Sequence, residues 1–139
     1  MHKYSYKNYT HTQYLVIDVE RRKNPENEWE NCSVAVCALD KKQELIYPST
    51  EFPLINALNC EDFLEESIGR ENSPYSSLQS FQLHLYKEDE FVEKLFYSLN
   101  FYRQKNTQLV AYNLEHDENI LKTMFHSSGF PFYFDDDIQ

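Results

Sequence analysis

The feature that most constrains the fold of this chain is a short apolar run that ends in acidic residues. The run Tyr14–Ile17 contains only aromatic, aliphatic and β-branched side chains; Asp18 follows it directly, and Glu20 comes two residues later. Such a run is typical of a strand that is buried on both faces at the centre of a sheet. Because a strand of this kind needs cover on both sides, the sequence predicts a layered α/β fold.

Two further strand candidates follow a polar stretch, 21–31, which is expected to form a loop. Residues 32–39 are apolar nearly throughout, and the turn residues 40–42 lead into a shorter run, 44–47. The short connection favours antiparallel neighbours. The first third of the chain is therefore predicted to form an antiparallel meander.

The middle of the chain is expected to cross from one edge of the sheet to the other. Residues 48–80 are rich in proline and contain one plausible helix, 60–67, which Asn59 would cap. In residues 87–105 apolar side chains recur at steps of three and four, which indicates an amphipathic helix packed on the sheet.

The last elements are a strand and a helix. Residues 108–112 form the next strand candidate, and Asn113 is placed to cap a helix over 114–128 that Gly129 and Pro131 would end. The predicted order of elements is three strands, a crossover, then helix, strand and helix. This order favours a mixed sheet with helices packed on it.

Length, charge and cysteine content limit the class of protein. A chain of 139 residues fits a single domain, 1–139, that begins with a polar arm, 1–12. A net charge of −10 argues against a surface that binds phosphates all over, but carboxylates that hold metal ions remain compatible with a nuclease. No apolar run approaches the roughly 20 residues of a membrane-spanning helix. Three cysteines without a CxxC spacing, and no signal-peptide core, favour an intracellular location.

Two groups of acidic residues carry the chemistry. Asp18 and Glu20 project to the same side of an extended chain, roughly 6–7 Å apart, where they can hold a divalent metal ion. An acidic pair after a strand is also common as the solvated start of a loop. Asp117 strengthens the metal interpretation, because it begins the same helix face as Leu121 and Met124. A carboxylate on a buried stripe is costly unless it caps, pairs or binds metal, and its favourable place in the helix dipole is the alternative explanation.

At these residues the sequence resembles the DnaQ-like (DEDD-type) 3′-5′ exonucleases of the ribonuclease-H-like superfamily. Val16–Glu20 matches the first motif of that family, a strand that ends in Asp-x-Glu. Ala111–Asp117 looks like the second motif, with His116 in its aromatic position. The resemblance extends over residues 13–134. It implies an α/β, ribonuclease-H-like mixed sheet with an antiparallel N-terminal meander and packed helices, truncated at the C-terminal end relative to the family.

The resemblance also implies an activity and a set of site residues. Family members hydrolyse phosphodiester bonds from 3′ ends of nucleic acid with two metal ions, and Mg²⁺ or Mn²⁺ suits an all-oxygen site. Asp18, Glu20 and Asp117 would be the catalytic metal ligands. The partner would be the 3′ end of a single strand, which Asn113 of the second motif would contact. Arg21 and Arg22, which are not part of the family pattern, could bind its phosphates.

The last acidic motif of the family is not found in its proper place. His126 has Pro131 where an Asp would be required, and the Tyr133 to Asp137 spacing is interpreted as coincidence at the end of a strand. A C-terminal segment outside this chain, or a protein partner, would have to complete the site. The alternative is a catalytically inactive module of the same fold that binds nucleic acid or a protein. A third alternative is an unrelated α/β interaction domain.

Basic residues stand after Glu20 where the family usually has small ones. Arg21, Arg22 and Lys23 would give phosphates a foothold on an acidic protein, although basic residues in a loop are more often simply solvated. Trp29 is either an exposed recognition anchor or a side chain that packs a loop down, and the second is commoner.

Overall fold

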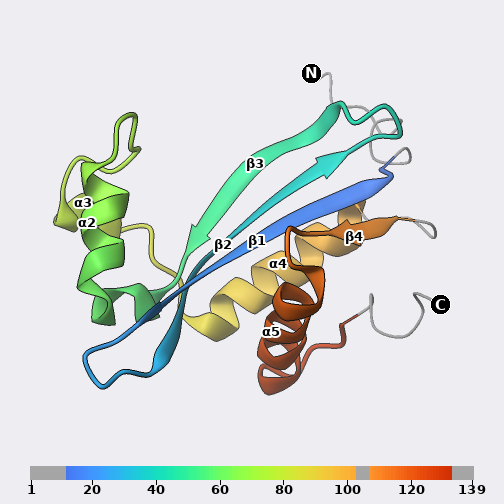
Figure 1. Ribbon diagram of the computed structural model, residues 1–139. Coiled ribbons are helices and arrows are strands. Elements are labelled where there is room, and N and C mark those ends of the chain that lie inside the picture. The colour runs from blue at the N-terminus through green and yellow to red at the C-terminus, as the bar shows by residue number, and fades with distance from the viewer. Residues whose placement is uncertain (1–11, 103–106, 133–139) are drawn as a thin grey trace.

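The structure is a computed structural model that describes residues 12–102 and 107–132. Within this part of the chain, four strands form one mixed sheet in the order β3-β2-β1-β4 (Figure 1). The strands are β1 (Tyr14–Lys23), β2 (Trp29–Leu39), β3 (Leu45–Pro53) and β4 (Gln108–Val110). Antiparallel pairing joins β1, β2 and β3, and β4 runs parallel to β1. The predicted meander and the predicted mixed sheet are both confirmed.

The helices fall into two groups. In the part of the chain that is described they are η1 (Ile55–Asn59), α2 (Glu61–Gly69), α3 (Leu78–Gln82), α4 (Glu88–Tyr102) and α5 (Leu114–Ser127). Figure 1 shows α4 and α5 together beneath the sheet, whereas α2 and α3 lie apart from them, beyond the C-terminal end of β3. No helix in the described ranges is long and apolar enough to cross a bilayer.

The main core lies between the sheet and the pair α4 and α5. Alternate residues of β1, Leu15 and Ile17, are almost fully buried and face it, and their partners on β2 are Ala38 and Val36. The helices contribute residues at helical spacing, which are Phe91, Val92, Leu95, Leu121, Met124 and Phe125. The apolar periodicity of the sequence predicted this packing.

The second core is smaller and lies against α2 and α3. Its buried members are Cys32, Ala57, Cys60, Phe63, Tyr75 and Phe81. The sequence predicted an irregular crossover in this region, with one helix. In the structure the crossover also contains η1 and the short helix α3, which Ser77 caps by accepting a hydrogen bond from the backbone nitrogen of Ser80 at 3.1 Å.

The largest difference from the sequence prediction concerns the length of the first hairpin. Residues 21–31 were expected to form a loop after Glu20, but β1 continues to Lys23, and β2 already begins at Trp29. Register explains the extension, since Arg21 pairs with Asn31 and Lys23 with Trp29 in the ladder. Backbone pairing across a tight turn thus forms strand from residues whose side chains are polar. Asp18 and Glu20 consequently lie inside a strand and not at its end.

The ends of several other elements also differ from the prediction. β3 extends to Pro53, beyond the predicted end at residue 47. Asn59 does not cap α2, because it ends η1 and Cys60 takes the cap position without a side-chain hydrogen bond. β4 stops at Val110, and the side chain of Tyr112 is fully exposed.

The end of α5 is as predicted. Gly129 has a φ of 83° and adopts the left-handed conformation that glycine favours after a helix. The backbone nitrogen of Phe130 then donates to the carbonyl of Phe125 at 2.9 Å, which closes the helix end. The predicted last turn of α4 near residue 105, the proposed strand at 132–134 and the Tyr133 to Asp137 pair lie wholly or partly outside the described residues.

Candidate functional site

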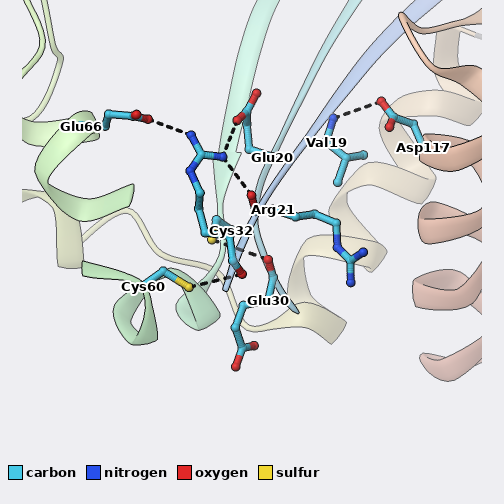
Figure 2. A network of polar contacts seen from close by, with 9 residues as sticks. Val19, Glu20, Arg21, Glu30, Cys32, Cys60, Glu66 and Asp117 are labelled. Atoms are coloured by element: carbon cyan, nitrogen blue, oxygen red, sulfur yellow. Dashed lines mark hydrogen bonds and ion pairs between the residues drawn. The ribbon is translucent and has the colours of Figure 1, made fainter. Parts of the chain in front are cut away.

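The candidate site lies on the edge of β1 where β4 ends. β4 pairs only with Tyr14–Val16, so the next part of β1 has no neighbouring strand on that side. The first turn of α5 takes that position. Figure 2 shows the Asp117 carboxylate directed at the backbone of Val19, whose nitrogen donates to Asp117 Oδ2 at 3.4 Å. Asp117 is only 7% exposed, as expected for a carboxylate that replaces the missing strand partner.

Asp18 and Glu20 approach the same edge from the other face of β1. Their side chains alternate with Ile17 and Val19, which face the main core, so they project to the opposite side. Asp18 is exposed and Glu20 is half-buried. Over the described residues, no three or more acidic, histidine or cysteine side chains gather closely enough to hold a metal ion. The three predicted carboxylates therefore surround the backbone of Val19 without forming a single cluster.

Arg22 accounts for the position of Glu20. Its guanidinium donates to Glu20 Oε1 at 3.0 Å and to Glu66 Oε1 of α2 at 2.8 Å, and its Cζ lies 5.6 Å from the centre of the Phe63 ring. Desolvation lowers the pKa of Arg22, but the hydrogen bonds and charges of the two carboxylates outweigh it, so the pKa is raised. Arg22 therefore remains a cation that links the first hairpin to α2. Its predicted contact with nucleic acid would require release from these carboxylates.

Arg21 lies on the face of β1 opposite to Arg22. Its Nε donates to Asn31 Oδ1 at 2.8 Å, and its Cζ lies 5.6 Å from the centre of the Trp29 ring. The Nζ of Lys23 lies 5.3 Å from the same centre. Trp29 is 56% exposed, so it does not pack a loop down as the commoner reading of the sequence held.

Asn113 begins α5 as predicted, but its side chain makes no capping hydrogen bond. The helix is started instead by its backbone carbonyl, which accepts from the nitrogen of Asp117 at 3.0 Å. The Asn113 side chain is exposed.

A cleft of about 380 Å³ joins these features. It is lined by Val19, Glu20, Arg21, Arg22, Trp29 and His116. Sequence reasoning did not assign a site role to Trp29 or His116. The signal for His116 was its place beside Asp117 in the second motif. Trp29 was considered as an exposed recognition anchor, but its place beside the cleft depends on the extended pairing of β1 with β2.

The three carboxylates fit a divalent metal ion in their chemistry and partly in their placement. Carboxylate oxygens are the ligands that Mg²⁺ and Mn²⁺ prefer, and Asp117 is already held in place by Val19. Glu20 is engaged by the Arg22 guanidinium. An ion bound by Glu20 would therefore take the place that the guanidinium occupies.

The arrangement of the sheet defines the class of fold. An antiparallel meander with its first strand next to a parallel strand, covered by helices, is the ribonuclease-H-like architecture that the sequence predicted. No family model matches the sequence, and no curated protein matches it in sequence.

Solved structures of exonuclease I share this fold. The E. coli Exonuclease I complex with a dT13 oligonucleotide matches with a TM-score of 0.59 and 16% identity over 88% of this chain. A second structure, described as suggesting how exonuclease I achieves processivity, matches with a TM-score of 0.60 and 14% identity over 88% of the chain. A third, the ExoI/SSB-Ct complex, has a TM-score of 0.59 and 13% identity. This chain spans only about a quarter of their length, 25% to 26%. At this identity the likeness establishes the fold, and the predicted resemblance is confirmed at that level.

Proposed function

We propose that this chain is a domain of a metal-dependent 3′-5′ exonuclease that acts on the 3′ end of single-stranded nucleic acid. One observation supports this proposal most strongly. The carboxylate of Asp117, a residue 98 positions away in sequence, contacts the backbone of the middle residue of Asp18-Val19-Glu20. Two acidic motifs that are distant in sequence therefore meet at one point on one strand. The shared fold with exonuclease I, which has been solved with a dT13 oligonucleotide, agrees with this function.

In the proposed site, Mg²⁺ or Mn²⁺ would be held by Asp18, Glu20 and Asp117. When bound, such ions supply an acidified water and stabilise the charge on the departing oxygen. Asp117 contributes a fixed anchor, because the start of α5 and the backbone of Val19 restrain its carboxylate. The exposed Asn113 would contact the terminal nucleotide. A ligand from beyond the described residues, in a further segment or a protein partner, would complete the set.

A second candidate function is a module of the same fold that binds nucleic acid or a protein without cutting. The ion pairs of Arg22 favour it. Glu20 already has a cation at 3.0 Å, and Glu66 holds that cation from the other side at 2.8 Å. In this alternative the guanidinium is the permanent counter-charge of Glu20 and no metal ion is needed.

The decisive experiment incubates the purified chain with 5′-labelled single-stranded DNA or RNA and Mn²⁺, and follows shortening from the 3′ end. Asp18→Asn and Asp117→Asn should lower the rate by more than about 100-fold, since even residues behind metal ligands cost 10–100-fold when they are changed. Asp62→Asn, an exposed acidic residue on α2, is the matched control and should leave the rate unchanged.

Binding of Mn²⁺, followed by its paramagnetic resonance signal, provides a readout that does not need activity. It should weaken in the Asp18 and Asp117 variants and persist in the Asp62 control. Shortening that survives both substitutions would reject the assigned site. A wild-type chain that neither binds Mn²⁺ nor shortens either strand would favour the second candidate.

A further inference from the structure

An exposed aromatic ring flanked by cations stands on one face of the first hairpin. Lys23 pairs with Trp29 across the ladder and Arg21 pairs with Asn31, so all four side chains lie on the same face of β1 and β2. Both cations lie over the Trp29 ring, with Cζ of Arg21 at 5.6 Å and Nζ of Lys23 at 5.3 Å from its centre. We name Arg21, Lys23 and Trp29 the basic aromatic platform.

The platform is available to a ligand, in contrast to its neighbour Arg22. Over the described residues, neither Arg21 nor Lys23 forms an ion pair with a carboxylate, whereas Arg22 has two such pairs. The Trp29 ring is more than half exposed. On a chain with a net charge of −10, a free pair of cations around an exposed indole is a local exception to the general repulsion of anions.

The platform also shares a cleft with residues beside the proposed active site. The cleft of about 380 Å³ is lined by Trp29 and Arg21 of the platform, by Val19, Glu20 and Arg22 of β1, and by His116, the neighbour of Asp117. Its volume is within the range of sites that bind small molecules, and it is therefore large enough for part of a nucleotide chain. A strand bound in this cleft would reach from the edge of β1 beside Asp117 to the platform.

We propose that Trp29 stacks on a base of a single-stranded nucleic acid while Arg21 and Lys23 bind the phosphates beside it. The inference rests on the proposed function for the direction of the strand, but not on cleavage. Single strands are bound elsewhere by aromatic rings that stack on bases and cations that follow the backbone, without sequence readout. The opposite charges of the platform and of the phosphate chain, and the exposed ring between the cations, both favour this ligand.

Trp29 is the only tryptophan of the chain, and this gives a direct test. Oligo-dT and oligo-U are titrated in EDTA, so that no metal-dependent step takes place, while the Trp29 fluorescence is recorded. A stacked base should quench and shift the emission in a saturable way. Affinity of labelled oligonucleotides for variants is then measured by anisotropy.

Trp29→Ala should weaken binding roughly 5- to 100-fold, the loss expected for one stacked base. The double variant Arg21→Gln/Lys23→Gln should weaken it further and lower the slope of log affinity against log salt by about 1.4, because each cation contributes roughly 0.7 for a single strand. Lys41→Gln/Lys42→Gln, which removes two exposed lysines from the turn between β2 and β3, is the matched control and should change neither quantity.

The outcomes separate this inference from the proposed function. Binding that is unchanged in Trp29→Ala and in the Arg21 and Lys23 variant overturns the platform, even if the chain shortens strands with Mn²⁺. Quenching and platform-dependent binding by a chain that neither binds Mn²⁺ nor shortens strands support the platform and favour the second candidate function over the nuclease. If only a protein ligand quenches Trp29 and no oligonucleotide does, the inference is wrong. Circular dichroism of each variant verifies that the hairpin still folds.

Discussion

The two faces of β1 beyond Ile17 differ in how their charges are used. On the face toward α2, Arg22 is surrounded by Glu20, Glu66 and the ring of Phe63. On the opposite face, Arg21 and Lys23 meet only an exposed ring and an amide in the described part of the chain. Three consecutive basic residues are thus divided into one structural cation and two that remain available.

The division follows from the alternation of a strand. Because successive side chains project to opposite faces, the basic run cannot act as one patch once it is part of β1. The same alternation separates Asp18 and Glu20 from Asp117, which reaches the strand from the side of α5. The positions of charged residues in the sequence therefore predict neither the carboxylate site nor the basic aromatic platform unless the extent of β1 is known.

The largest loss of unfolding free energy is expected from a substitution in the main core, which supports the face of β1 toward α5. Leu121 is fully buried on the same face of α5 as Asp117, and Leu121→Ala should cost about 2–5 kcal/mol of unfolding free energy through lost burial and a residual cavity. Because α5 loses its packing, the hydrogen bond of Asp117 to Val19 should weaken as well.

Urea unfolding followed by circular dichroism measures this loss. Leu83→Ala is the control, since this leucine is 85% exposed and its removal should stay within about 0.5 kcal/mol. A loss from Leu121→Ala no larger than that of the control would show that α5 is not held by the main core.

The main core was predictable from the sequence because its signals are local. The run Tyr14–Ile17, the helical spacing of α4 and the Gly129 stop each depend on a few adjacent residues. Asp117 was also found from its place on the buried stripe of α5. Each of these features is decided by side chains within one or two turns.

The platform and the role of Arg22 were not predictable, because they depend on partners from other elements. No apolar periodicity marks Arg21 or Lys23 as strand residues, and only pairing with β2 places them there. Arg22 is paired with Glu66, 44 residues away. Trp29 becomes exposed through the same pairing, which places it opposite Lys23 and over a cleft instead of against a core.

Burial near the α2 face of β1 should also make the free energy of unfolding depend on pH. Burial raises the pKa of the Cys32 thiol to about 12, with a further contribution from the neighbouring Cys60. A thiol has a pKa of about 8.5 in an unfolded chain. Since the folded-state pKa is the higher one, the stability contributed by the neutral thiol is complete below about pH 8.5 and is lost as the pH rises toward 12.

Unfolding by urea at pH 7.5 and at pH 10 tests this, with the difference between the two midpoints as the observable. Cys32→Ala should reduce that difference, whereas Cys37→Ala, at a less buried position, should reduce it less. Equal pH responses in the wild type and in Cys32→Ala would show that water reaches the second core, and the contrast between the two faces would then be weaker than described.

The smallest loss of unfolding free energy is expected from substitution of Arg22, although this residue forms two ion pairs. Arg22→Met retains the aliphatic stem over Phe63 and removes both ion pairs, yet these side chains are 31%, 39% and 67% exposed, so the loss should stay within about 1 kcal/mol. A double-mutant cycle with Glu66→Gln separates the free energy of the ion pair from that of the packing of the stem.

Because Glu20 loses its counter-charge, the Arg22→Met variant should also bind Mn²⁺ more tightly than the wild type if Glu20 is a metal ligand. Unchanged Mn²⁺ binding would remove Glu20 from the proposed site. A loss of several kcal/mol of unfolding free energy would instead show that Arg22 is essential to the stability of the hairpin.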